Sequence, residues 1–269
     1  MRELREMPPE VLAAVRGLFF DIDDTFTTAG RVTAAAYAAL ERLHEAGCLL
    51  VPITGRPAGW CDHIARMWPV DAVVGENGAF YFCYERSARQ LIRRFRDDAA
   101  TRAANRARLG AVRDRILREV PGAALASDQP YREADLAIDY CEDVPALAWS
   151  AVDRIASIMR EAGMTTRVSS IHVNGWFGRY DKLGMARLAL AERFGVDLDA
   201  ERSRFVFVGD SPNDAPLFAY FPHAVGVANV RDFAPRMEHL PAYVTERARG
   251  AGFAELANKL LARSPRAEP

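Results

Sequence analysis

Short apolar runs alternate with helix-like segments through the first and last thirds of the chain. Runs typical of buried strands occur at Gly17–Phe20 and at residues 48–53, 72–74, 204–208 and 224–227. Between them, helices are predicted over 33–44, with Thr33 as N-cap and Gly47 as the stop, over 60–68, and from Lys182 to about 194. Strands that alternate with helices predict an α/β fold with a parallel sheet flanked by helices.

The pattern changes between residues 85 and 180. An arginine-rich helix is predicted over 86–119 and a second helix over 145–161, with strands at 123–126, 135–140 and 165–173. Apolar and polar residues alternate in the last two strands, which predicts an antiparallel sheet with one apolar face on the helices and one open polar face, like a lid. We therefore expect a core of residues 1–84 and 181–269 and an inserted α+β domain of residues 85–180. The tail at 264–269 is expected to fray.

Composition narrows the class of protein. The chain has 269 residues, of which 50% are hydrophobic and 26% charged, and its net charge is −1. This balance argues against a nucleic-acid binder, and no stretch approaches the roughly 20 apolar residues of a membrane span. The four cysteines have no metal-ligand spacing, which favours reduced thiols and a cytoplasmic protein; they are Cys48, Cys61, Cys83 and Cys141.

Two acidic clusters follow apolar strands. Asp21 and Asp23 come directly after Gly17–Phe20, and Asp210 and Asp214 come after the run at 205–208. Carboxylates brought together at strand ends repel one another unless a cation binds them. Because oxygen ligands suit hard cations, the two clusters predict one split Mg²⁺ site. Asp214 could also act as a helix N-cap.

Lys182 and Thr54 complete the candidate chemistry. Only two of the 35 basic residues are lysines, Lys182 and Lys259, so the generic basic roles fall to arginine and Lys182 calls for a specific reason. The Lys182 ammonium, the Thr54 hydroxyl and loop N–H groups beside Gly55 suit phosphate oxygens. The sequence has no serine–histidine–acid arrangement, so an aspartate is the natural nucleophile.

Four segments resemble, in this order, the four motifs of the haloacid dehalogenase (HAD) superfamily. They are Asp21-Ile-Asp-Asp-Thr, Thr54-Gly-Arg, Lys182 and Gly209-Asp-Ser-Pro-Asn-Asp. The inserted region is similar to the C2 cap of its Cof-like subfamily IIB, which includes sugar phosphatases, sucrose-phosphate phosphatases and phosphomannomutases. Glu76-Asn-Gly-Ala also resembles these proteins. The resemblance implies a Rossmann-like parallel sheet with an inserted C2-type cap.

The resemblance also implies a role for each motif. Asp21 would be the nucleophile that becomes an aspartyl-phosphate, and Asp23 the general acid and base. Mg²⁺ would bridge the carboxylates and the Asp23 backbone carbonyl. The implied metal-binding residues are Asp21, Asp23, Asp210 and Asp214, and the implied phosphate-binding residues are Thr54, Gly55, Lys182 and Asn213.

The predicted function is a Mg²⁺-dependent phosphomonoester hydrolase that acts on a small phosphorylated metabolite, above all a sugar phosphate, without nucleic-acid or membrane partners. Two alternatives are a phosphomutase of the same subfamily and a non-catalytic sensor of a phosphorylated ligand. Arg56, Arg132, His172 and Asn174 are candidates for substrate contacts, with structural ion pairs or solvated surface positions as the alternative. The sequence carries no signal for oligomeric state.

Overall fold

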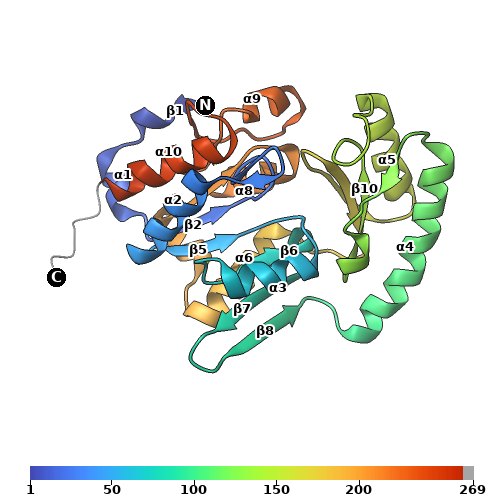
Figure 1. Ribbon diagram of the computed structural model, residues 1–269, viewed down its shortest axis with the longest axis horizontal. Helices are drawn as coiled ribbons and strands as arrows, with labels where there is room; N and C mark the ends of the chain where they lie inside the picture. The colour runs from blue at the N-terminus through green and yellow to red at the C-terminus, as the bar shows by residue number, and fades with distance from the viewer. Residues whose placement is uncertain (263–269) are drawn as a thin grey trace.

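A six-stranded parallel sheet forms the centre of the computed structural model, which describes residues 1–262 (Figure 1). Every neighbouring pair of strands in it runs parallel, which confirms the predicted α/β fold. The expected fraying of residues 264–269 lies outside the described residues. Along the sheet the strands are β1 (Arg2–Glu3), β15 (Tyr243–Val244), β14 (Val225–Gly226), β13 (Phe205–Gly209), β2 (Gly17–Phe20) and β5 (Leu49–Pro52).

Helices cover both faces of this sheet. Side chains alternate along β2, so Leu18 and Phe20 pack on one face and Phe19 on the other. The helices of the first face are α1 (Pro9–Ala14), α2 (Ala34–Glu45), α3 (Ala58–Met67) and α10 (Arg249–Leu261). Those of the second face are α6 (Lys182–Phe194), α7 (Leu198–Glu201), α8 (Ala215–Tyr220) and α9 (Val230–Phe233). Burial on both faces explains why these strands read as continuous apolar runs.

Capping residues fix where two of the core helices begin. The Thr33 hydroxyl accepts the Ala36 N–H at 3.3 Å, and the chain leaves α2 through Gly47 at φ +76°. Asp181 caps α6 by accepting the Gly184 N–H at 2.7 Å. The predicted start of this helix at Lys182 is thereby confirmed.

A hairpin extends the sheet beyond β5. Strand β6 (Val73–Gly75) is joined to the sheet by a bridge between Ile53 and Val74, and it pairs with β7 (Phe80–Glu85), which pairs with β8 (Gln90–Phe95). The helix predicted from residue 86 is therefore wrong at its start, because α4 begins only at Ala99. The turn into β8 places Arg89 at φ +52° without a glycine, so no turn signal stands in the sequence there. A second short hairpin is formed by β3 (Thr27–Thr28) and β4 (Arg31–Val32).

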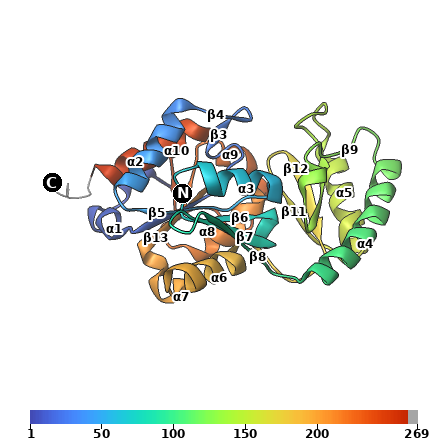
Figure 2. The same ribbon diagram turned by 60° about the horizontal axis from the view of Figure 1, so that its bottom comes forward.

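A separate four-stranded antiparallel sheet lies to one side of the core, together with α4 (Ala99–Glu119) and α5 (Trp149–Glu161) (Figure 2). We call these elements the cap layer. Its strands are, in order, β11 (Thr165–Val168), β12 (His172–Trp176), β10 (Asp135–Asp139) and β9 (Ala124–Leu125). The predicted single strand at 165–173 is wrong, because a turn divides it into β11 and β12. The predicted division of the chain at residues 85 and 180 stays a prediction, and β8 pairs with β7 inside the range assigned to the insert.

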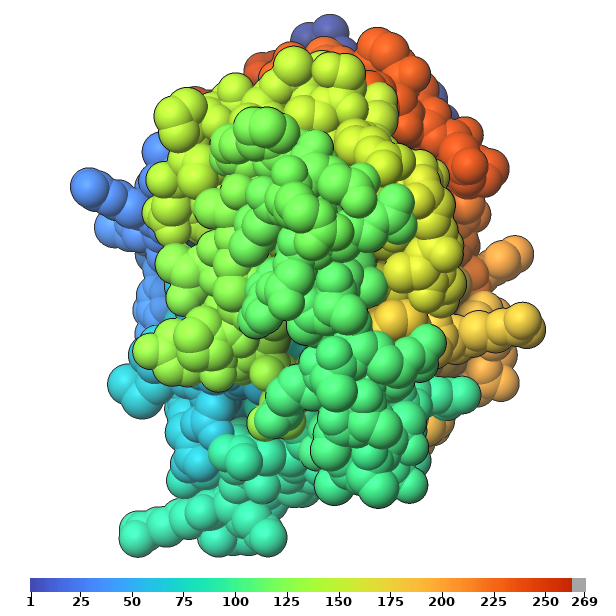
Figure 3. Space-filling model, turned by 90° about the vertical axis from the view of Figure 1, so that its right-hand side faces the viewer, coloured from blue at the N-terminus to red at the C-terminus, as the bar shows by residue number. Residues whose placement is uncertain are grey.

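The two faces of the cap sheet differ as predicted, but the polar face is covered. Leu136, Ile138 and Val173 pack in one apolar cluster with residues of α4 and α5. On the other face, Asp135, Asp139, His172 and Asn174 are at most 3% exposed. We expected this face to be open, and it is buried, with its carboxylates bonded to Arg132, to Asn174 and to backbone N–H groups of the cap layer itself. Figure 3 shows the cap layer, in green and yellow, in front of the core.

No helix within residues 1–262 combines the length and apolar character needed to cross a lipid bilayer.

Candidate functional site

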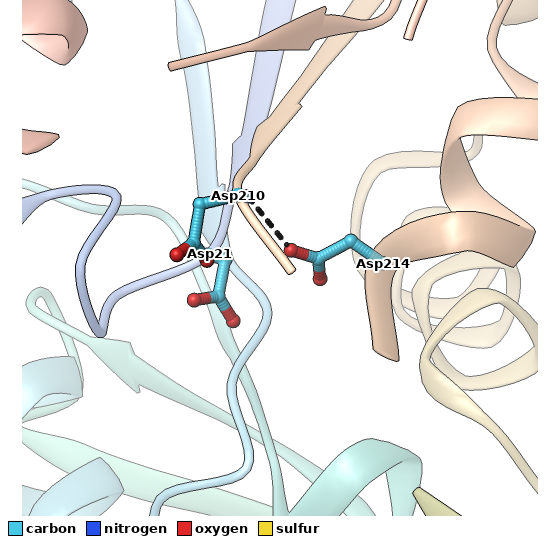
Figure 4. A group of neighbouring side chains, drawn as sticks. All are labelled: Asp21, Asp210 and Asp214. Atoms are coloured by element: carbon cyan, nitrogen blue, oxygen red, sulfur yellow. Dashed lines mark hydrogen bonds between the residues drawn. The ribbon is translucent and has the colours of Figure 1, made fainter. Parts of the chain in front are cut away.

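Three buried carboxylates meet at the carboxyl ends of two neighbouring strands. Asp21 follows β2 and Asp210 follows β13, and the Asp21 N–H donates to the Val208 carbonyl at 2.9 Å. Asp214 reaches the same place from the short 3₁₀ turn at Pro212–Asp214 (Figure 4). All three are at most 5% exposed, and one oxygen from each lies within 4.8 Å of the others. The sequence predicted this convergence from the two strand-end clusters, and we call these three residues the carboxylate trio.

Lys182 lies against the trio. Its Nζ donates to Asp21 Oδ1 at 2.9 Å and to Asp214 Oδ1 at 2.8 Å, and the side chain is buried. The position is fixed by the capped start of α6. A compact ammonium can bond two carboxylates at once in this space, which explains why a lysine stands here in an arginine-rich chain.

Asp214 does more than bind Lys182. Its Oδ2 accepts the N–H groups of Asp210 at 3.1 Å and Ser211 at 3.4 Å, so it also fixes the loop that follows β13. Both interpretations of the residue, as a site carboxylate and as a local cap, thus describe contacts that it makes. Asp210 in turn accepts Asn229 Nδ2 at 3.0 Å and the Thr25 hydroxyl at 3.4 Å.

The electrostatics of the trio fit a divalent cation. Burial raises the pKa of Asp21 to about 8, and Asp214 and Asp23 add to this effect, although Lys182 opposes it. Burial and the charges of Asp21 and Asp214 also raise the pKa of Asp210 well above its usual value. One ammonium does not balance three buried carboxylates, so these oxygens have the number, charge and chemistry of a Mg²⁺ site.

The Asp23 carboxylate lies outside the trio. Arg56 Nε donates to both of its oxygens at 3.0 Å, and Nη2 donates to Oδ1 at 2.8 Å. The fork of the guanidinium therefore holds this carboxylate in one orientation. The neighbouring Asp24 is engaged elsewhere, because its Oδ1 accepts Arg249 Nε at 2.8 Å. The two aspartates that flank Ile22 thus have different surroundings and can have different roles.

Arg56 also connects the core with the cap layer. Besides Asp23, its guanidinium bonds Glu142 at 2.5 Å and Asp128 at 3.3 Å, and it lies over the Trp60 ring at 4.4 Å. Glu142 Oε2 lies 2.9 Å from His172 Nε2. The loop that carries Glu142 is fixed by Asp139, which accepts the N–H groups of residues 141–143 at 2.7 to 2.9 Å.

Arg132 and Asn174, two of the candidates for substrate contact, are engaged inside the protein. Arg132 bonds Asp128 and Asp135, and its Nη1 donates to the Gly55 carbonyl at 2.8 Å. Asn174 Nδ2 donates to Asp135 at 2.9 Å. Both side chains therefore support the contact between cap layer and core, and their direct contact with a substrate stays a prediction.

Two of the expected phosphate-binding residues line the same region. The buried Thr54 hydroxyl accepts the Arg56 N–H at 3.0 Å, which closes the loop through Gly55. Asn213 lies on the turn that precedes α8, where its Oδ1 accepts the Ser211 hydroxyl at 3.0 Å. The structure thus brings Thr54, Lys182 and Asn213 to the end of the sheet that carries the trio.

Sequence reasoning missed Glu76 as an anchor of the cap layer. This buried carboxylate accepts the N–H groups of Ala58 at 3.0 Å, Glu133 at 2.9 Å and Ala134 at 2.6 Å. It belongs to the Glu76-Asn-Gly-Ala motif, which the sequence singled out by resemblance only. Glu142 and Asp128 were missed as well, because short loops between cap strands carry them and no periodic pattern marks such positions.

Replacing Glu76 by alanine should destabilise the protein by about 3 kcal/mol, because several buried N–H groups would lose their acceptor. Glu76→Gln keeps one carbonyl oxygen as an acceptor and should therefore lower the free energy of unfolding by less than Glu76→Ala does. Urea unfolding of both variants measures the difference. An alanine variant as stable as the wild type would show that these hydrogen bonds do not hold the cap layer.

The Arg56–Glu142–His172 contact should weaken in acid. Burial opposes ionisation of Glu142, but the hydrogen bonds with His172 and Arg56 prevail and hold its pKa at about 2. A carboxyl group whose pKa is lowered by folding stabilises the fold at a pH above its usual pKa, near 4.5. This stabilisation is lost as the pH falls toward 2. Between about pH 5 and 3, the free energy of unfolding should therefore fall by about 1 kcal/mol more in the wild type than in Glu142→Gln; the difference is this small because Glu142 is partly exposed. Urea unfolding at both pH values tests this, with Glu246→Gln, an exposed position, as control; equal pH slopes in wild type and Glu142→Gln would contradict it.

Comparison with known proteins agrees with this geometry. The family model of haloacid dehalogenase-like hydrolases matches residues 18–102. A phosphoglycolate phosphatase of Methanothrix thermoacetophila is 26% identical over 250 residues, which cover 92% of this chain and 98% of that protein. Over residues 18–102 the chain is therefore similar to the haloacid dehalogenase-like hydrolases, a superfamily of phosphatases and related enzymes. The family match and this relative together support a phosphatase of that superfamily.

Solved structures establish the same fold for core and cap layer together. The C-terminal domain of a Candida albicans trehalose-6-phosphate phosphatase superposes with a TM-score of 0.69 at 12% identity, covering 97% of each chain. A HAD subclass IIB sugar phosphatase superposes with a TM-score of 0.59 at 14% identity, covering 93% of this chain and 100% of that one. At these identities the similarity concerns the fold.

Proposed function

We propose that this protein is a Mg²⁺-dependent phosphomonoester hydrolase that works through an aspartyl-phosphate on Asp21. The observation that carries the proposal is that two carboxylates, two residues apart, have different surroundings. Asp21 lies in the buried trio beside Lys182, whereas Asp23, two residues later, is held apart by Arg56. The first environment suits a nucleophile beside a cation, and in the second Arg56 fixes the orientation of a carboxylate outside the trio, as a positioned acid and base requires.

In the proposed reaction, an Asp21 oxygen attacks the phosphorus atom while the bond from phosphorus to the leaving oxygen breaks. Asp23 gives its proton to that oxygen, and the alcohol departs. Asp23 then accepts a proton from water, whose oxygen attacks the phosphorus and releases phosphate from Asp21. Lys182, Thr54, Gly55 and Asn213 would hold the phosphoryl oxygens in line for both steps.

Asp21, Asp210 and Asp214 would hold the metal, together with the backbone carbonyl of Asp23. A bound Mg²⁺ would neutralise charge on the trio and on the phosphoryl group and would orient the two. Burial, together with the mutual repulsion of the trio, raises the pKa of Asp21 and Asp210, and a cation bound between these carboxylates would relieve both effects, which supports this assignment.

The proposed substrate is a small phosphorylated metabolite. We propose a core of residues 1–84 and 181–269 and a cap of residues 85–180, with the substrate between them. The contacts of Arg56 with Glu142 and of Arg132 with Gly55 support this arrangement, in which the cap would limit access to small molecules. The sugar-phosphate phosphatases that share the fold support a sugar phosphate as substrate. The similarity to the phosphoglycolate phosphatase of Methanothrix thermoacetophila adds phosphoglycolate as a second candidate.

A phosphatase panel tests the proposal. Sugar phosphates, 2-phosphoglycolate, nucleoside monophosphates and p-nitrophenyl phosphate should release inorganic phosphate with Mg²⁺ and not after EDTA treatment, and added Mg²⁺ should restore the release. Phosphate release from none of these compounds would contradict the hydrolase. Strict dependence on a bisphosphate activator, with phosphoryl transfer and no phosphate release, would instead support the phosphomutase.

A further inference from the structure

A very small cavity lies beside Lys182 between the core and the cap layer. Its volume is about 10 Å³, close to the least that one water-sized group needs. Most of its lining is apolar, but polar residues border it from three directions: Asn77 from the turn after β6, Arg167 from cap strand β11, and Lys182 with Asn213 from the site itself. The cavity therefore has the size to receive a single oxygen atom beside these polar residues.

Asn77 is held in place while its amide lacks partners. Its N–H donates to the Thr54 carbonyl at 3.1 Å, yet among the described residues neither Oδ1 nor Nδ2 of the buried side chain has a hydrogen-bond partner. The turn is conformationally demanding, with φ of +42°, +56° and +106° at Glu76, Asn77 and Gly78. A Cβ on Gly78 would lie 2.0 Å from the Asp181 carbonyl oxygen, so glycine permits the close approach to the start of α6. A buried amide without partners, kept by a strained turn beside a candidate site, points to a ligand.

Arg167 is a cap arginine without a carboxylate partner. It pairs in register with Asn174, so both side chains leave the sheet on the face that meets the core. Within residues 1–262 it forms no ion pair, and its guanidinium donates to the neighbouring Thr166 carbonyl at 3.1 Å. Arg56 and Arg132, by contrast, are each bonded to two or more carboxylates.

Charge balance explains why the site would need Arg167. The Lys182 ammonium already bonds two carboxylates, and a divalent cation would balance the charge that remains on the trio. A phosphoryl dianion that enters such a site needs further positive charge and N–H donors.

We propose that Arg167 and Asn77 bind an oxygen of the substrate's phosphoryl group, in addition to Thr54, Gly55, Lys182 and Asn213. This inference rests on the proposed phosphatase function. Because Arg167 comes from the cap layer and Asn77 from the core, the phosphoryl group would itself join the two parts. Binding of phosphate alone, without a leaving group, would then add a contact between the cap layer and the core.

Binding of inorganic phosphate, measured as the rise of the melting temperature with phosphate concentration in Mg²⁺ buffer, tests the subsite without relying on turnover. Arg167→Gln removes the charge, and Asn77→Gly removes the amide at a backbone conformation that glycine adopts readily. Each should raise the apparent Kd for phosphate about tenfold, as expected for one lost charge-assisted or buried hydrogen bond. Arg160→Gln is the matched control. Arg160 lines the neighbouring surface groove together with Arg167 but not the cavity beside Lys182, so the variant should leave the Kd within about twofold.

The double variant sharpens the test. If both side chains contact one phosphoryl group, the phosphate Kd of the double variant should rise by less than the product of the two single-variant increases. An unchanged phosphate Kd in both single variants would overturn the subsite and leave a bound water as the occupant of the cavity, and so would a wild-type protein that binds no phosphate. Weakened phosphate binding in the variants, with no phosphomonoester hydrolysis by the wild type, would refute the proposed function and leave the subsite standing.

Discussion

Replacing Asp21 by asparagine is expected to reduce kcat by at least about 10⁴-fold, because the amide cannot attack phosphorus and form the phosphoenzyme. The fold should survive the change. The asparagine oxygen can still accept Lys182 Nζ, and one of three mutually repelling buried carboxylates disappears. We therefore expect a melting temperature no lower than that of the wild type.

The matched control for Asp21→Asn is Asp24→Asn. Asp24 lies in the same loop, but its carboxylate bonds Arg249 and is not part of the trio. It should keep kcat within a few-fold of the wild type. Full activity in Asp21→Asn would exclude this residue as the nucleophile. An intact ligand response in Asp21→Asn, together with no turnover by the wild type, would favour the sensor instead.

Replacing Lys182 by arginine should lower kcat/KM by about 10² to 10³-fold, although the charge is kept. The ammonium bonds Asp21 and Asp214 from a buried position at the first residue of α6. The guanidinium is larger and planar, so we expect it to displace the two carboxylates from these positions. Steady-state kinetics with p-nitrophenyl phosphate measure the loss.

The other lysine of the chain supplies the control for Lys182→Arg. Lys259 Nζ donates to the Arg5 carbonyl at 3.0 Å near the C-terminal end of α10, far from the trio in the fold. Lys259→Arg should change kcat/KM less than about twofold. Equal and near-normal kinetics in both variants would show that the site needs only a positive charge at position 182.

The sequence predicted the site better than it predicted the cap layer, for a physical reason. Asp21, Asp210 and Lys182 lie at the ends of buried strands or at the start of a helix. Continuous apolar runs predict such strands, and capping residues predict such a helix start. Neighbouring parallel strands must then bring their carboxyl ends together. The register of β2 with β13 does this for Asp21 and Asp210.

The interface between core and cap layer could not be predicted in the same way. Glu76, Asp128 and Glu142 lie in loops, and their partners are distant in sequence, such as Arg56 for Glu142. The hairpin before α4 was missed because its turn uses Arg89 in a left-handed conformation instead of glycine. Polar and apolar residues alternate in the cap strands as they do in a sheet with one solvated face. Only the packed structure shows that the polar side chains are buried and paired, as Asp135 is with Arg132.

Trapping the phosphoenzyme tests the central claim most directly. In Asp23→Asn, the good leaving group of p-nitrophenyl phosphate still permits attack by Asp21, but the water that should release phosphate lacks its base. The acyl phosphate should accumulate, and borohydride reduction after an acid quench should convert residue 21 to homoserine, which peptide mass spectrometry identifies. Homoserine at position 21, and none in Asp21→Asn treated alike, is the predicted result; a label at another residue, or turnover without any label, would contradict the account.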